Sequence, residues 1–216
     1  MTRALIDTSP DLRQQLLAAE VGVLDAVLFT HAHADHTHGI DELRAITLNM
    51  RRRVPVWADH KTADALFRRF GYAFKTPDGS SYPPIVDCGL IEPLVPVEVL
   101  GGGGTLEVTP FEVEHGDIRA LGFRVLDVAY TPDINGVPGE SQAALSGLSC
   151  WIVDALRRTT HPSHWSLSET LEWIAFFAPR RAVITNMHLD LDYDGLCAEL
   201  PPHIRPAFDG MAMEFE

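Results

Sequence analysis

Three histidines and an aspartate crowd six consecutive residues, His31, Ala32, His33, Ala34, Asp35 and His36. The mostly apolar run of residues 23–30 before them predicts a buried strand that ends at this loop. In extended chain His31 and His33 point to the same side, whereas Asp35 and His36 can turn toward a neighbouring point. Imidazole nitrogens and carboxylate oxygens are common ligands of divalent metals. The spacing therefore predicts a site for two metal ions.

Further ligand types occur where other predicted strands end. His115 follows a strand over 106–113, Asp133 follows residues 128–132, and His188 follows a strand over 182–185. Their recurrence after successive strands favours one shared centre. Asp154 also ends an apolar strand and competes with Asp133 as the bridging carboxylate. Pro132 favours Asp133, because proline enforces an extended turn, and Asp154 could instead pair with an arginine.

A proton donor is also expected near these ligands. His161 and His164 lie on the loop before the capping box Ser166 to Glu169, which predicts a helix through residue 177. The pKa of histidine lies near neutral pH, so one of these imidazoles could protonate a leaving group.

The composition favours one soluble domain over residues 1–216. A net charge of −13 disfavours nucleic acid as a partner, because a phosphate backbone would be repelled. The three cysteines form no CxxC pair, which fits a reducing cytoplasm. The sequence shows no transmembrane run and no signal peptide, so no membrane partner is expected.

Hydrophobic periodicity and turn residues predict alternating strands and helices. Ser9 and Pro10 are expected to open a helix, Gly71 to end a helix over 61–70, and the proline-rich residues 75–96 to form a loop. The other expected elements are helices over 41–48 and 193–200, strands over 54–58, 106–113, 121–126, 127–130, 150–154 and 182–185, and a turn over 101–104.

Motifs along most of the chain resemble the metallo-β-lactamase-fold hydrolases, in particular the PhnP-like cyclic phosphodiesterase branch. They are Leu5-Ile6-Asp7-Thr8, Thr30 to His36, His115-Gly116, Tyr130-Thr131-Pro132-Asp133, Val153 to Arg157, His161-Pro162-Ser163-His164, Asp190-Leu191-Asp192 and Phe208-Asp209-Gly210-Met211. The resemblance implies an α/β fold, the αββα sandwich. The family's early N-terminal strands have no counterpart before Leu5, so the fold is expected to lack them. A truncated sequence, a misplaced start and a short variant are all left open.

The resemblance also implies roles for individual residues. His31, His33 and His115 hold one metal, Asp35, His36 and a late histidine hold the other, and Asp133 bridges them. In the family the late histidine directly follows the threonine of the final strand, but Asn186 follows Thr185 here. His188 is favoured for that role over Asn186, because residues i and i+2 of an extended chain face the same way.

These residues predict a dinuclear zinc or manganese phosphodiesterase that acts on a small phosphorylated sugar or nucleotide, such as a cyclic phosphate. Asp35 would orient the attacking hydroxide and His164 would protonate the leaving oxygen. A nuclease of the tRNA-processing type and an inactive metal- or nucleotide-binding homologue are the alternatives. β-Lactam hydrolysis and flavodiiron chemistry fit less well, because the N-terminus supports no export and His33 stands where the flavodiiron pattern prefers glutamate. An exposed sheet edge would favour a homodimer.

Overall fold

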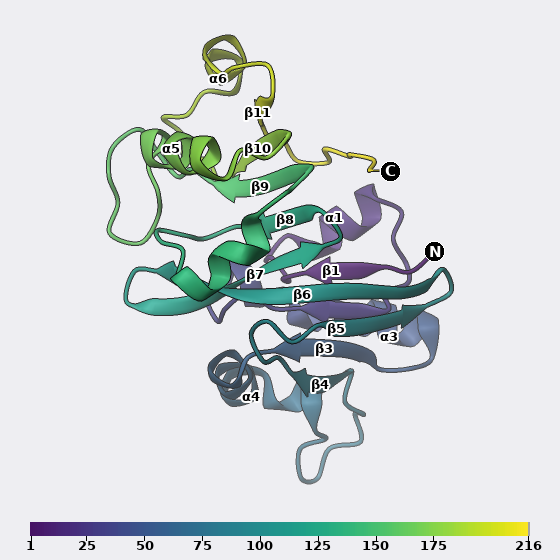
Figure 1. Cartoon of the computed structure of the whole chain (residues 1–216). Helices are drawn as coiled ribbons and strands as arrows, with labels where there is room; N and C mark the ends of the chain where they lie inside the picture. Colours follow the sequence, from purple (N-terminus) through teal and green to yellow (C-terminus); the bar gives the residue numbers. More distant parts are fainter. Residues whose placement is uncertain (216) are drawn as a thin grey trace. The chain divides into compact units, whose positions relative to one another are not determined.

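The computed structural model describes residues 1–215 and contains two compact units, Met1–Glu107 and Val108–Glu216. Both units combine strands with helices (Figure 1), which confirms the predicted α/β class. The prediction of a single domain over residues 1–216 stays a prediction.

The first unit alternates strands and helices. Its elements are β1 (Ala4–Ile6), α1 (Leu12–Ala18), β2 (Ala26–Leu28), α2 (Ala34–Thr37), a short 3-10 helix (Ile40–Glu42), α3 (Leu43–Met50), β3 (Val54–Ala58), α4 (His60–Phe74), β4 (Val86–Leu90) and β5 (Val97–Gly101). The first four strands form a parallel sheet in the order β1-β2-β3-β4. Parallel strands end at one common edge, so the loops after β1 and β2 lie near each other.

Helices cover this sheet because their apolar stripes bury against it. Leu12 of α1, Leu43 of α3 and Leu66 of α4 belong to one buried cluster with Val54 and Val56 of β3. Along β3 the side chains alternate between buried and half-buried positions, as expected for a strand with one face on the core. This packing fixes the ends of the strands that carry candidate ligands.

The second unit is built on a larger sheet. Its elements are most of β6 (Gly104–His115), β7 (Ile118–Val125), β8 (Val128–Thr131), a 3-10 helix (Gly139–Leu145), β9 (Cys150–Asp154), α5 (Leu167–Phe177), β10 (Arg181–Thr185), α6 (Tyr193–Glu199) and β11 (Ile204–Pro206). The strand order is β11-β10-β9-β8-β7-β6, and β5 follows β6 in the same order. The strands β8, β9, β10 and β11 are parallel, so β8, β9 and β10 end side by side.

An aromatic core holds α5 on this sheet. Trp151 of β9 is fully buried and lies edge to face with Trp165 and Phe177, at centroid distances of 6.2 and 5.6 Å. Ser166 caps α5 and forms a complete capping box with Glu169, as the sequence predicts. The helix and the loop before it are therefore fixed against β9.

Three predicted elements need correction. Pro10 does not open a helix: Asp11 is the N-cap of α1, and the hydroxyl of Ser9 donates to the side chain of Gln15. Gly71 does not end α4, which continues past a kink at Phe70 because Ala73 is buried in the core.

The third correction concerns residues 75–96, which are not all loop. They contain β4, which pairs in parallel with β3. Gly89 makes the pairing possible, because a Cβ there would lie 2.5 Å from the Trp57 ring.

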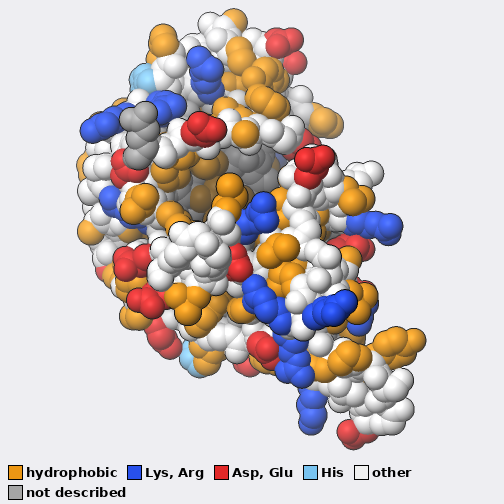
Figure 2. Space-filling view, turned by 90° about the vertical axis from the view of Figure 1, so that its right-hand side faces the viewer, with side chains coloured by type: hydrophobic (Ala, Val, Ile, Leu, Met, Phe, Trp, Pro, Cys, Tyr) orange, Lys and Arg blue, Asp and Glu red, His pale blue; other side chains and the backbone are white. Residues whose placement is uncertain are grey.

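Hydrophobic side chains also remain on the surface, and in Figure 2 they lie scattered among charged ones on the face drawn. Leu17, Leu48 and Phe176 are among the exposed ones. Within residues 1–215, no helix has the length and apolar character needed to span a membrane.

Candidate functional site

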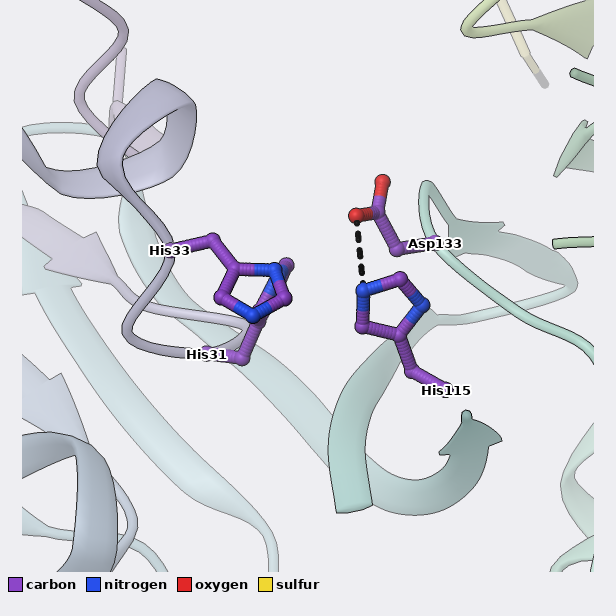
Figure 3. A group of neighbouring side chains, drawn as sticks. All are labelled: His31, His33, His115 and Asp133. Atoms are coloured by element: carbon purple, nitrogen blue, oxygen red, sulfur yellow. Dashed lines mark ion pairs between the residues drawn. The ribbon is translucent and has the colours of Figure 1, made fainter. Parts of the chain in front are cut away.

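The histidine-rich loop follows β2 in the first unit. His31 is buried, and the exposed His33 is the N-cap of the short helix α2. Their ring centroids lie 4.5 Å apart, and a ligand nitrogen of each ring lies within 4.8 Å of the other. Figure 3 labels these two rings of the first unit. The predicted convergence of His31 and His33 is thus observed.

Asp7 and Thr30 set the tautomer of His31. The backbone N–H of Thr30 donates to Oδ1 of Asp7 at 2.7 Å, and its hydroxyl donates to Oδ2 at 2.8 Å. Because that hydroxyl proton is used, Oγ1 of Thr30 accepts from Nδ1 of His31 at 3.0 Å. The Nε2 atom of His31 then carries the lone pair that a metal ligand needs.

His36 is held by the same carboxylate. Its Nδ1 atom lies 2.7 Å from Oδ2 of Asp7, and a carboxylate oxygen accepts, so Nδ1 carries the proton. The other ring nitrogen, Nε2, lies 3.4 Å from Oδ2 of Asp35. Two ligands at zinc distances and a tetrahedral angle are about 3.4 Å apart, so this pair has the spacing of a metal-binding edge.

Sequence reasoning assigned no role to Asp7 or Thr30. Burial raises the pKa of Asp7 above its ordinary value, and the hydrogen bond from His36 opposes this shift. Asp7 also has a positive φ of 60°, which an aspartate tolerates better than most residues. The signals in the sequence are its place as the polar residue that ends the apolar run 4–6 and its presence in the motif Leu5-Ile6-Asp7-Thr8.

His115 and Asp133 form a matching pair in the second unit. His115 ends β6, and Asp133 follows β8. Nδ1 of His115 donates to the carbonyl oxygen of Ser163 at 2.7 Å, which leaves the lone pair on Nε2. This Nε2 lies 3.4 Å from Oδ2 of Asp133, as the dashed line in Figure 3 marks. Both side chains are buried.

The turn after His115 brings Ser163 close. Gly116 has a positive φ of 62°, and a Cβ on it would lie 2.9 Å from Cβ of Ser163. The backbone N–H of Gly116 donates to Oδ1 of Asn135, whose amide donates to the carbonyl of Pro162. The glycine therefore allows the loop of His164 to pack against the ligand-bearing strand end.

Asp154 pairs with His164 and not with an arginine, the pairing left open from the sequence. Its Oδ2 atom lies 2.7 Å from Nδ1 of His164. Burial is the largest cause that raises the pKa of Asp154 to about 7, and the hydrogen bond from His164 partly offsets it. The carboxylate thus fixes the His164 ring and leaves Nε2 to face other groups. Arg157 instead donates to the carbonyls of Thr159 and Thr160.

His161, the other candidate proton donor, has a different environment. Its Nδ1 accepts from the backbone N–H of Ser163 at 3.3 Å. Partial burial, and then the neighbouring His164, lower the pKa of His161. His164, whose Nδ1 lies 2.7 Å from the buried carboxylate of Asp154, is therefore the better positioned candidate.

The structure brings Asn186, and not His188, to Asp133. The Nδ2 atom of Asn186 donates to Oδ1 of Asp133 at 2.9 Å. The ring of His188 lies 3.0 Å from Asp190, and its side chain is more than half exposed. The i+2 argument assumed an extended chain, but Asn186 adopts a left-handed conformation with φ 59°, which turns the chain.

The donor set in each unit fits divalent metal ions. The first unit offers His31, His33, Asp35 and His36, and the second offers His115 and Asp133. These residues provide four imidazoles and two carboxylates, which suit zinc and manganese. The Nδ1 atoms of His31, His36 and His115 are held by oxygen acceptors, so Nε2 of each ring is the nitrogen that can bind a metal.

Comparisons with known proteins agree with these observations. The family described as Beta-lactamase superfamily domain matches residues 2–187. A solved structure of a diphosphatase from the PhnP family is 30% identical, with a TM-score of 0.88, over 99% of this chain and 80% of that one. These matches confirm the resemblance and the metallo-β-lactamase fold class predicted from the sequence.

Two curated relatives carry other names. An octanoyltransferase of Porphyromonas gingivalis is 33% identical over 214 residues, which are 97% of this chain and 42% of that protein. A ribonuclease Z of a Bradyrhizobium strain is 33% identical over 132 residues, 59% of this chain and 41% of that protein. The chain therefore spans about two fifths of the length of the curated relatives it matches.

Proposed function

The chain belongs to the beta-lactamase superfamily, a family of metallo-β-lactamase-fold hydrolases, and from this premise we propose that it hydrolyses phosphodiester bonds in small molecules. The proposal rests on one arrangement of a histidine and a carboxylate that occurs in both units. In each unit a histidine whose Nδ1 is held by an oxygen acceptor presents Nε2 at 3.4 Å from a carboxylate oxygen. Such a pair can supply two ligands to one divalent cation.

We propose that the two sets of ligands serve one dinuclear centre. His31, His33 and His115 would hold one zinc or manganese ion, Asp35 and His36 would hold the other, and Asp133 would contribute to both. Bound ions of this kind lower the pKa of water and neutralise charge on a phosphate. The last ligand of the second ion, His188 or Asn186, is considered below.

The protein's own side chains would position the substrate and move protons. The Asp35 carboxylate is 69% exposed, so it can accept a hydrogen bond from the attacking water and orient it. His164 would donate its Nε2 proton to the leaving oxygen, because Asp154 holds Nδ1 and stabilises the charged ring. Asp154 acts here as a positioning residue.

A small substrate is favoured by the charge of the chain. At −13 the protein repels long polyanions, whereas a small diester carries one charge to be neutralised at the centre. The named activity of the PhnP-family structure supports phosphate chemistry. The partner would thus be a small phosphodiester or nucleotide, and a cytoplasmic homodimer is part of the same proposal.

A nuclease of the tRNA-processing type is the second candidate, and the similarity to ribonuclease Z supports it. The two candidates differ in substrate size, so one assay separates them. The metal-loaded protein is offered 2′,3′-cyclic nucleotides, bis(p-nitrophenyl) phosphate and a precursor tRNA, with a variant lacking both His31 and His33 as the control.

We expect turnover of the small diesters that depends on the two histidines. Cleavage of the precursor tRNA without turnover of small diesters would establish the nuclease instead. No turnover of any substrate by protein that retains metal would favour the inactive homologue.

A further inference from the structure

The chain departs from the family pattern directly after its last central strand. The strand β10 ends at Thr185, and the next residue is Asn186, where the resemblance implies a histidine that holds the second metal. Asparagine is neutral, and its amide can offer either an oxygen acceptor or two N–H donors. Which end faces the centre therefore decides what this residue does.

The contacts of Asn186 assign the amide orientation. Nδ2 lies 2.9 Å from Oδ1 of Asp133 and 3.2 Å from the carbonyl oxygen of Pro132. Both partners are acceptors, so the N–H groups must face them and the amide oxygen must face away. A φ of 59° at Asn186 supports this turn, and asparagine is one of the few residues that tolerate it.

This contact gives the two carboxylate oxygens of Asp133 different partners. Oδ1 accepts from Asn186, while Oδ2 lies 3.4 Å from Nε2 of His115. A carboxylate can bridge two cations by offering one oxygen to each of them. The oxygen beside His115 faces a candidate metal ligand, whereas the other already accepts a hydrogen bond from a neutral donor at the position where the resemblance implies an imidazole ligand.

His188 does not restore the missing imidazole. Its Nδ1 lies 3.0 Å from Oδ1 of Asp190, and its backbone N–H donates to the carbonyl of Leu156. The backbone N–H of Arg158 also donates to Asp190, so this loop is tied to the segment that directly follows β9.

We propose that Asn186 makes the two metal positions unequal: the ion at His31, His33, His115 and Asp133 would be held tightly, and the ion at Asp35, His36 and Asp133, which lacks the late histidine, would be held weakly. This inference rests on the proposed dinuclear centre. It implies that the second ion exchanges freely at low metal concentration, and that Asn186 acts as a donor to Asp133 and not as a ligand.

Metal retention tests the inference without any measurement of activity. The protein is loaded with Zn²⁺, titrated with a chelator of known affinity, and followed by native mass spectrometry. Wild-type protein is expected to lose one ion well before the other. Asn186→His is expected to tighten the weaker ion by about tenfold or more, within the range by which ligand-shell changes alter metal affinity.

Two further variants separate the possible roles. Asn186→Ala removes this donor to Oδ1 and no ligand, so the weaker ion should bind about as well as in wild type. His188→Ala should leave both steps unchanged. Loss of the weaker ion in Asn186→Ala would show that Asn186 is a metal ligand, and its loss in His188→Ala would show that His188 is one. Either result would overturn the inference. Two equally tight ions in the wild-type protein would overturn it as well.

These results are distinct from failure of the proposed function. Protein that retains no metal at all would reject the dinuclear centre itself. Two unequal ions without phosphodiester turnover would uphold the inequality and reject only the activity. Circular dichroism of each variant shows whether it is folded, and the wild-type titration alone tests the inequality.

Discussion

Nδ1 of His36 lies 2.7 Å from the buried carboxylate of Asp7, 29 residues earlier in the chain. The same carboxylate accepts two hydrogen bonds from Thr30, which in turn holds His31. One buried acidic group thus orients two candidate ligands, which the proposed dinuclear centre assigns to different ions.

Asp7→Asn is therefore expected to weaken metal binding although Asp7 is not itself a ligand. The amide can present an N–H where His36 needs an acceptor, so the ring loses its fixed tautomer. The expected loss in affinity is about 10- to 100-fold, as for other residues that orient ligands. Chelator titration measures it, with the exposed Asp87→Asn as the matched control. Equal affinities in both variants would contradict the role of Asp7.

Removal of metal is expected to abolish activity. Dialysis against a chelator should inactivate the protein and readdition of Zn²⁺ or Mn²⁺ should restore it, because the protein side chains alone do not generate hydroxide near neutral pH. Elemental analysis of His33→Ala should show lower metal content than wild type. His60→Ala is the control, since His60 is an exposed histidine beside Glu92. Full activity of metal-free protein would exclude the hydrolase mechanism.

His164→Ala is expected to lower turnover by about a hundredfold or more while the metal content stays constant, as for loss of a general acid. The loss should be smaller for a p-nitrophenyl diester, because p-nitrophenolate leaves without much protonation. Steady-state kinetics on both substrates measure this difference. Equal losses on both would assign His164 to phosphate binding or to structure.

The buried Asp154 is expected to give the metal-free protein an unusual pH dependence of stability. Its pKa in the folded protein is about 7, against 3.8 for an ordinary aspartate. Between these values the folded state binds the extra proton, so the free energy of unfolding falls as pH rises. The fall is up to about 1.4 kcal/mol per pH unit and ends above pH 7.

Denaturant unfolding of wild type and Asp154→Asn between pH 4 and 8, with a chelator present, measures this effect. The wild type should lose stability relative to the variant up to pH 7, and the difference should then stay constant. Parallel curves over the whole range would mean that Asp154 titrates normally.

Hydrophobic patterns and capping residues predicted the strands and helices that are determined by neighbouring residues in the sequence. The alternation in 54–58 and the apolar run 150–154 gave β3 and β9 with their observed bounds, and Ser166 with Glu169 gave the start of α5. The strand β4 was missed because its glycine and the prolines before it are typical of loops. That glycine is needed by Trp57, a contact 32 residues away that no local pattern contains.

The candidate ligands could likewise be predicted where they depend on residues close together in the sequence. His31, His33, Asp35 and His36 are adjacent, so their types and spacing identify them. The supporting contacts of Asp7 with Thr30 and of Asn186 with Asp133 span 23 and 53 residues, and only the folded chain brings them together. The choice of His188 over Asn186 depended on an extended backbone, which the left-handed turn at Asn186 replaces.

His115 is anchored through the backbone carbonyl of Ser163, the residue directly before His164. A substitution at position 163 keeps this acceptor, so the orientation of His115 depends on the path of the loop and not on its side chains. The expected proton donor and a candidate metal ligand are consequently positioned by the same stretch of backbone. A change in the backbone path of this loop that moved His164 would also move the acceptor of His115, whereas a side-chain substitution at position 164 would leave that acceptor in place.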